Sequence, residues 1–558
     1  MRSKLSFLLV LSLVLPSGAW AEPERAPSAA EMQRSAGKAR KGKTRKGKTR
    51  KGKNARGKSS GASRGCKLKA MSKVRRLKID PAIKTLFAKS VVNDGTISPH
   101  FRTSCCREST DTLVCSPDSV GEGDHRCYKS RTPSDFNEIT RRTGIKVGAS
   151  PYSDGSYKKY ERYEREGKNI KLVLTSNDLD AARWEKKYAN LMYIQTWDDS
   201  HARLLADPEK LARHIYKHRG RIAQLSYNES SNNDLSVVFA GGADQDEDPL
   251  TGKGRALVGA LFDQYILVDV SHVGTQSALE ILTEAYERGR PITANHANAI
   301  GVYDDNYRSD DCRGGCKSRN HTDAVICGIA KSGGVVGATP IRFMMAPTIA
   351  NEYQPATEND FLEHVDYMAK RLTCFNQAGK KIDMTKHVGL GSDSKVNGYA
   401  PKVGWLHMKT GSRLNRWKRV ATRLKNECGY SLSEIERIVG GNLNRVYRRA
   451  LPGLRRPALK RPRNDSVQRS KKVIFEWRRP KVNKPKWQPN WETTITGAKA
   501  FEVVIHRKKG GTFSKYITVK AGNKTKKTIK LNPGTYRWYV RAEGSQPVNS
   551  VWREFVRR

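Results

Sequence analysis

The chain has 558 residues, which exceeds an ordinary single domain and predicts two or three folded units with linkers. Lys and Arg number 104 against 55 acidic residues, and the formal charge of +49 exceeds what solubility requires, so a polyanionic partner is expected. After the first residues, no stretch approaches the roughly 20 apolar residues that cross a bilayer, so we expect no transmembrane span.

Residues 1–21 have the pattern of a secretory signal peptide. Arg2 and Lys4 precede an apolar run from Leu5 to Leu15, and Ala19-Trp20-Ala21 has the small-x-small form that a signal peptidase cleaves. We therefore expect export to the periplasm, the cell surface or the medium.

Residues 22–65 are almost free of large apolar side chains and repeat a unit of the type Lys41-Gly42-Lys43-Thr44-Arg45. Such a segment has nothing to bury and is predicted to be disordered. We interpret it as a tether to anionic envelope polymers, with a plain solvated spacer as the alternative. A nucleic-acid-binding role depends on charge alone, because no aromatic side chains are interleaved for base stacking.

Residues 66–450 alternate short apolar runs with amphipathic segments, such as Ser277 to Glu287 and Phe361 to Arg371. Repeated strand and helix signals over this length favour an α/β fold, a closed (β/α)8 TIM-like barrel. The clearest strand signals are Leu191–Ile194, Ile222–Leu225, Tyr265–Val268, Gly334–Gly337 and His387–Leu390.

The ten cysteines are clustered in the N-terminal part of this region and scattered later in the chain. In an oxidising compartment they are expected to form disulfides, whose pairing the spacing does not reveal. Cys312-x3-Cys316 leaves a zinc clip as the alternative for one pair.

A terminal helix is predicted from Leu432 to Arg449, and a basic, proline-containing linker follows at residues 451–466. Residues 467–558 contain closely spaced β-branched and aromatic runs, which predict a small antiparallel, immunoglobulin-like sandwich. The stretch Leu531 to Ala542 resembles the late strands of a fibronectin type III module, and it suggests adhesion or spacing.

Polar residues at predicted strand ends are the candidates for chemistry, because parallel barrels carry their active sites there. One run ends in Asp269-Val270-Ser271-His272, a second in Asn295-His296, and a third in Ser392-Asp393. Two imidazoles suit a zinc ion, and a carboxylate can move the proton of a bound water.

Seven motifs in order strengthen this interpretation, and together they resemble the renal (membrane) dipeptidase family of zinc peptidases over residues 170 to 450. They are Val268–Gly274, Arg290–Ala299, Arg319–Asp323, Gly333–Gly337, His364–Tyr367, His387–Asp393 and Gly440–Val446. The resemblance implies that His272 and His296 bind zinc, that Asp393 lies at the metal centre, and that Arg319 holds the substrate carboxylate. A guanidinium fork suits that last role.

The departures from the family pattern are informative. The His-x-Asp pair that opens the family's barrel is missing if Asp94-Gly95 marks its place, and the bridging glutamate is replaced by Gln195, followed by Asp198. A neutral amide bridges two cations poorly, so one zinc ion is expected, with two as the alternative. Tyr227 and Asn228 stand where the family has an active-site histidine, and they are candidate substrate contacts.

The leading hypothesis is therefore a secreted, metal-dependent hydrolase that cleaves a dipeptide or related short amide with a free carboxylate. The alternative is a degenerate dipeptidase-like barrel that serves in envelope binding or adhesion. The survival of His272, His296, Arg319 and Asp393 favours the enzyme, whereas the missing ligands favour the alternative. A homodimer is left open.

Overall fold

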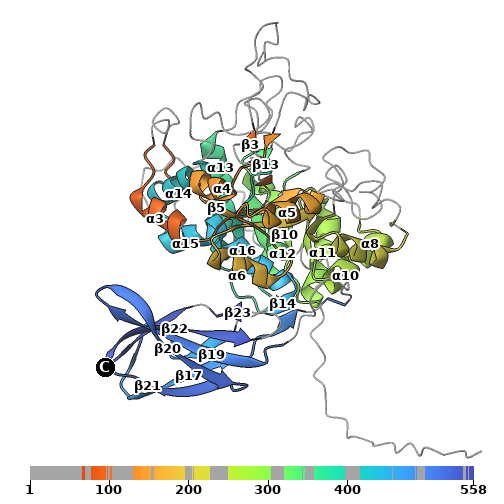
Figure 1. Cartoon of the computed structure of the whole chain (residues 1–558). Helices are drawn as coiled ribbons and strands as arrows, with labels where there is room; N and C mark the ends of the chain where they lie inside the picture. Colours follow the sequence, from red (N-terminus) through yellow and green to blue (C-terminus); the bar gives the residue numbers. More distant parts are fainter. Residues whose placement is uncertain are drawn as a thin grey trace, which may run out of the picture.

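The computed structural model describes residues 66–69, 77–95, 97–98, 101–102, 130–151, 156–194, 204, 206–225, 249–302, 319–341, 344–345, 357–395, 415–454, 457–483, 485–486, 497–543, 548–550 and 552–558. A helix-covered barrel makes up the larger part, and a smaller all-β unit lies beyond one end of it (Figure 1). No helix among the described residues is long and apolar enough to span a bilayer.

Eight parallel strands form the barrel in the order β1-β5-β7-β8-β9-β10-β11-β12. Their bounds are β1 Val92–Asp94, β5 Ile145–Pro151, β7 Tyr188–Ile194, β8 Gly220–Gln224, β9 Leu267–Asp269, β10 Thr293–Ala297, β11 Val335–Ala338 and β12 Val388–Leu390. The first and last strands meet where the Gly95 amide donates to the Leu390 carbonyl at 2.8 Å. The predicted TIM-like barrel is thereby confirmed, and it is nearly closed.

Short strands extend the barrel sheet or lie beyond its ends. β6 (Ile170–Leu172) adds to β7, and β2 (Ile97–Ser98) pairs in parallel with β13 (Ser394–Lys395) beyond the ends of β1 and β12. β3 (Phe101–Arg102) pairs with β4 (Ser130–Arg131).

Helices surround the barrel, and several begin at side-chain caps. Thr175 and Thr357 form capping boxes with Asp178 and Asp360, and Asp207 caps a helix that starts with Pro208. The helices are α3 Pro81–Lys89, α4 Asn137–Thr143, α5 Ser156–Arg165, α6 Ser176–Trp184, α8 Pro208–Lys217, α10 Gly252–Asp263, α11 Thr275–Glu287, α12 Asp323–Lys331, α13 Glu358–Asp366, α14 Arg416–Asn426, α15 Leu432–Glu436 and α16 Asn442–Ala450, with single 3-10 turns at Ile300–Val302 and Met384–Lys386.

The predicted terminal helix from Leu432 to Arg449 is interrupted. A π-helical turn, Arg437–Gly441, separates α15 from α16. A second π-helical turn, Tyr367–Arg371, extends α13. Gly440 is the cause, because a Cβ there would lie 2.1 Å from the Val91 carbonyl oxygen and 2.6 Å from the Asn93 amide nitrogen. Only a glycine lets the chain approach β1 this closely.

The interruption turns α16 against the N-terminal end of the barrel. Leu443, Val446 and Tyr447 are fully buried and pack in one cluster with inward-facing strand residues. The cluster's strand residues include Val147, Ala149, Leu191, Tyr193, Ile222, Leu267 and Val335. The Asn442 amide fixes the start of α16 by donating to the carbonyls of Thr385 at 2.9 Å and Val388 at 2.8 Å. The barrel is therefore plugged at this end, and its functional opening lies at the strands' C-terminal ends.

The C-terminal unit contains two facing sheets around an aromatic core. One sheet has the order β15-β17-β21, and the other has the order β16-β24-β22-β19-β20 with β23 beside β22. Buried Trp477, Trp538, Phe475, Phe501 and Phe555 fill the space between them. Bounds are β15 Ala458–Arg461, β16 Ser466–Gln468, β17 Lys472–Arg478, β19 Ala500–Lys509, β20 Thr512–Gly522, β21 Lys526–Lys530, β22 Gly534–Glu543, β23 Val548–Asn549 and β24 Arg553–Arg557.

The predicted all-β sandwich is thus present, but it is not wholly antiparallel, because β16 pairs in parallel with β24. The Tyr536 hydroxyl donates to the Asn532 carbonyl at 2.7 Å, a contact typical of the corner of immunoglobulin-like sandwiches. The likeness to a fibronectin type III module remains a prediction.

The sandwich joins the barrel at the plugged end. Asn483, in the short strand β18 (Val482–Asn483) that pairs with β14 (Gly453–Leu454), donates to the carbonyls of Arg449 and Leu451 at 3.0 and 2.9 Å. The Lys486 amide donates to the carbonyl of Asp263, the last residue of α10. These contacts place the sandwich at the end of the barrel opposite the functional opening.

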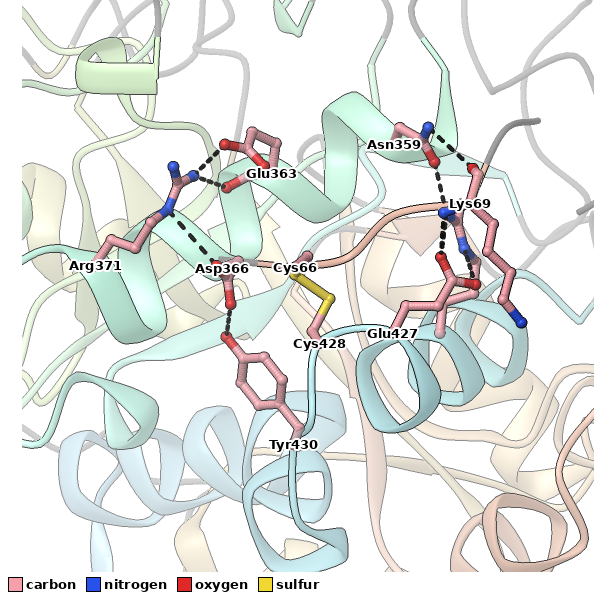
Figure 2. The surroundings of a disulfide bond; sticks show 10 residues. Cys66, Lys69, Asn359, Glu363, Asp366, Arg371, Glu427, Cys428 and Tyr430 are labelled. Atoms are coloured by element: carbon pink, nitrogen blue, oxygen red, sulfur yellow. Dashed lines mark hydrogen bonds and ion pairs between the residues drawn. A yellow bond between two sulfur atoms is a disulfide. The ribbon is translucent and has the colours of Figure 1, made fainter. Parts of the chain in front are cut away.

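A disulfide between Cys66 and Cys428 ties the first described residues to the end of α14 (Figure 2). Beside it, the amides of Lys67 and Lys69 donate to the backbone and side chain of Glu427 at 2.9 and 3.0 Å, and Arg423 pairs with the same carboxylate at 2.8 Å. A second disulfide links Cys327 to Cys374. The chain segment that follows residue 65 is therefore held covalently against the barrel.

Candidate metal centre at the mouth of the barrel

Two imidazoles face each other at the C-terminal ends of neighbouring strands. His272 lies three residues beyond β9, His296 lies within β10, and their Nε2 atoms are 2.9 Å apart. Both side chains are buried. Burial, together with the charges of His296, Arg319 and His321, holds the pKa of His272 well below its usual value, so this ring is neutral at neutral pH.

The buried carboxylate of Asp269 holds both histidine-bearing segments in place. It accepts hydrogen bonds from the amides of Ser271 at 3.0 Å and Asn295 at 2.6 Å, and from the hydroxyls of Thr293 at 3.0 Å and Tyr193 at 3.2 Å. Burial raises the pKa of Asp269, although the nearby His296 and the hydrogen bonds from Ser271 and Asn295 act to lower it. In the sequence, Asp269 is marked only as a carboxylate directly after an apolar run, within the motif Val268–Gly274.

Asp393 lies beside the second imidazole. Its Oδ2 atom is 3.9 Å from Nε2 of His296, and its side chain is almost fully buried. Gly391 allows this approach, because a Cβ there would lie 1.7 Å from the Asn295 carbonyl oxygen. His272 and Asp393 both adopt left-handed backbone angles, with φ of 61° and 43°. Such strained non-glycine residues often mark functional sites.

Arg319 and His321 lie on the segment that precedes α12. Arg319 is half-buried, and its charge is among the causes that lower the pKa of His272. His321 is buried, its Nε2 atom has no hydrogen-bond partner among the described residues, and burial lowers its pKa to about 4. His321 stands inside the Arg319–Asp323 motif, but nothing in the sequence alone distinguishes it from a histidine without a role at the site.

The placement of Asp94-Gly95 at the opening of the barrel agrees with the structure, since β1 ends at Asp94. The Asp94 carboxylate is fully buried and accepts from the Ser392 amide at 2.7 Å and the Trp417 indole at 3.0 Å, with Arg416 at 3.5 Å. Through these contacts it joins β1 to the Asp393 segment and to α14.

Gln195, Asp198, Tyr227 and Asn228 lie outside the described residues. So do Cys312 and Cys316, the pair for which a zinc clip is the alternative to disulfides. Strand β7 ends at Ile194, directly before Gln195. Strand β8 ends at Gln224, three residues before Tyr227.

The side chains present fit a metal ion. Two nitrogens bound to one tetrahedral zinc ion lie about 3.3 Å apart, so the observed pair needs to open by only a few tenths of an ångström. Neutral imidazoles are the form that binds metal. The described residues contain one tight group of three potential ligands elsewhere, Cys66, Asp366 and Cys428, but its two sulfurs form the disulfide of Figure 2 and leave no thiolate for a metal.

Fold and site together define a metallohydrolase-type (β/α)8 barrel. The family model of the membrane dipeptidases, peptidase family M19, matches residues 155–452, and the chain belongs to this family. It is accordingly a hydrolase of the metallopeptidase class, and its family is metal-dependent.

Several solved structures resemble the chain. An amidohydrolase from Pseudomonas aeruginosa is 18% identical, with 66% of this chain and 98% of that chain covered and a TM-score of 0.46. The probable dipeptidase PvdM from the same organism is 16% identical, with coverages of 68% and 98% and a TM-score of 0.46. A metallo peptidase from Rhodobacter sphaeroides, liganded with a phosphinate mimic of L-Ala-D-Ala, is 17% identical, with coverages of 65% and 100% and a TM-score of 0.41. No curated protein matches the chain.

Proposed function

We propose that the protein is a zinc-dependent hydrolase of dipeptides or related short amides, with its centre at His272 and His296. The observation that carries this proposal is the 2.9 Å approach of two buried ring nitrogens at neighbouring strand ends, in a chain of the membrane dipeptidase family. Two protein ligands leave coordination positions of a zinc ion open, and Gln195 and Asp198 remain candidate ligands for them. One zinc ion is proposed, because Thr96 and Ser98 stand where the family has its His-x-Asp pair, and the neutral amide of Gln195 stands where it has the bridging glutamate.

Each residue of the site has a separate role in the proposed hydrolysis. A zinc ion, when bound, supplies a Lewis acid and a water of lowered pKa. His272 and His296 bind through Nε2, and Asp269 keeps their segments in register. Asp393 accepts a proton at its carboxylate and returns it to the leaving amine. Arg319 orients the free carboxylate of the substrate, with Tyr227 and Asn228 as further contacts.

Metal removal tests the proposal. Purified protein is expected to contain about one zinc ion per chain and to hydrolyse L-Ala-D-Ala. Dialysis against a chelator should remove both properties, and added zinc should restore both. Zinc-free protein that still hydrolyses the dipeptide would refute the metal mechanism. Zinc-loaded protein that is inactive on a panel of dipeptides would favour the degenerate binding protein.

The carboxylate clamp gives a separate prediction. Arg319→Lys keeps the charge but loses the two-pronged donor, so KM for a dipeptide is expected to rise about tenfold with little change in kcat. A C-terminally amidated dipeptide, which has no carboxylate to clamp, serves as the control and should show no such rise. An equal rise for both substrates would remove Arg319 from this role.

The remaining parts of the chain suggest where the enzyme works. We infer export through residues 1–21, supported by the two disulfides, which are typical of oxidising compartments. Residues 22–65 are proposed as a polyanion tether. The sandwich domain, expected at 467–558, begins earlier, because β15 at Ala458–Arg461 already belongs to one of its sheets and Leu459 to its core, which shortens the linker expected at 451–466. A homodimer remains a proposal.

A further inference from the structure

The outer surface of the β16-β24-β22-β19-β20 sheet carries basic and aromatic side chains that the sandwich core does not use. We call this surface the outer face. Cross-strand pairing places Arg537 beside His506, Tyr539 beside Val504, and Arg541 beside Glu502. Strand β20 adds Lys515 opposite His506 and Phe513 opposite Lys508. Trp552, just before β24, contacts Tyr539 and His506, with ring centroids 4.4 and 4.7 Å apart.

Arg537 lies at the centre of the outer face, held between two rings. Its guanidinium carbon is 4.4 Å from the ring centre of Trp552 and 4.8 Å from that of Phe513. Its Nε atom has no hydrogen-bond partner, and no carboxylate pairs with it among the described residues, although Glu554 is its register partner on β24. The two ring contacts restrict where the guanidinium can lie, which favours its donors binding an anion.

The charge around Arg537 has one dominant sign. Lys508, Lys515, Lys520 and Arg541 lie on the same face, against the carboxylates of Glu502, Glu543 and Glu554. Partial burial, together with the charges of Arg537 and Lys515, lowers the pKa of His506, which agrees with a positive local potential. Sandwich cores need apolar inner faces, but no packing requirement places cations in a row on an outer one.

We propose that the outer face binds an acidic polysaccharide, with Arg537 pairing a carboxylate of the polymer and the lysines pairing its neighbours. Charge complementarity demands a polyanion. Two observations favour a glycan over a nucleic acid. The guanidinium of Arg537 already covers a face of Trp552 and of Phe513, where bases would stack. The disulfides indicate a compartment outside the cytosol, where anionic glycans are common partners.

Binding of the whole mature protein to polygalacturonate tests the proposal. Arg537→Gln is compared with Arg478→Gln, which removes the same charge from the exposed end of β17 on the other sheet. Because both variants retain residues 22–65, the contribution of that segment cancels. We expect affinity to fall about tenfold in Arg537→Gln, the loss of one charge-assisted hydrogen-bond pair, and to stay unchanged in Arg478→Gln.

The other outcomes are decisive too. Equal loss in both variants would show that only net charge matters and would overturn the proposal. Tighter binding of a single-stranded oligothymidylate, with the same dependence on Arg537, would assign the face to nucleic acid instead. If Arg537→Gln lowers the unfolding midpoint, the exposed Lys515→Gln variant decides, since unchanged affinity in a stable Lys515→Gln protein would also overturn the proposal.

Discussion

His296→Ala is expected to abolish zinc binding and hydrolysis together, whereas Asp393→Asn is expected to abolish hydrolysis alone. The first variant removes one of two facing imidazoles, so the ion loses a ligand in a buried site. The second removes the proton acceptor while keeping its size, and asparagine tolerates the left-handed backbone at position 393. Loss of a general base costs about 10²- to 10⁴-fold in rate.

Zinc content and kcat for a dipeptide, measured on the same preparations, distinguish the two roles. His214→Ala removes a histidine from helix α8 on the outside of the barrel and should change neither quantity. Retained zinc in His296→Ala, or lost zinc in Asp393→Asn, would reverse our assignment of ligand and base.

Asp269→Ala should destabilise the barrel by about 3–5 kcal/mol, because breaking a buried charged network leaves its partners without compensation. The amides of Ser271 and Asn295 and the Thr293 hydroxyl would lose this acceptor, whereas the Tyr193 hydroxyl would keep Gln224. Urea unfolding measures this change through the midpoint at constant slope. The matched control is Asp263→Ala, a partly exposed carboxylate paired with Arg288, with an expected cost below about 1 kcal/mol. Equal effects in both variants would mean that Asp269 does not organise the mouth.

The barrel was predictable because its strands are apolar runs that end in polar residues, as at Tyr265–His272. Those endings also placed His272, His296 and Asp393 at one mouth. The π-helical turn before α16 was not predictable, because it depends on how closely Gly440 approaches β1, a contact between residues far apart in the sequence. For the same reason, the residues next to Asp269 in the sequence do not reveal that its carboxylate joins two segments. Nor do the residues next to Asp94 reveal its hydrogen bonds to α14 and to the Asp393 segment.

The attachment of the sandwich has a consequence for an enzyme that is anchored to a polymer. Asn483 and Lys486 connect the sandwich to the sealed base of the barrel, so a molecule immobilised through its outer face would keep its entrance free. Small substrates and products could then exchange with the surrounding fluid while the protein itself stays in place.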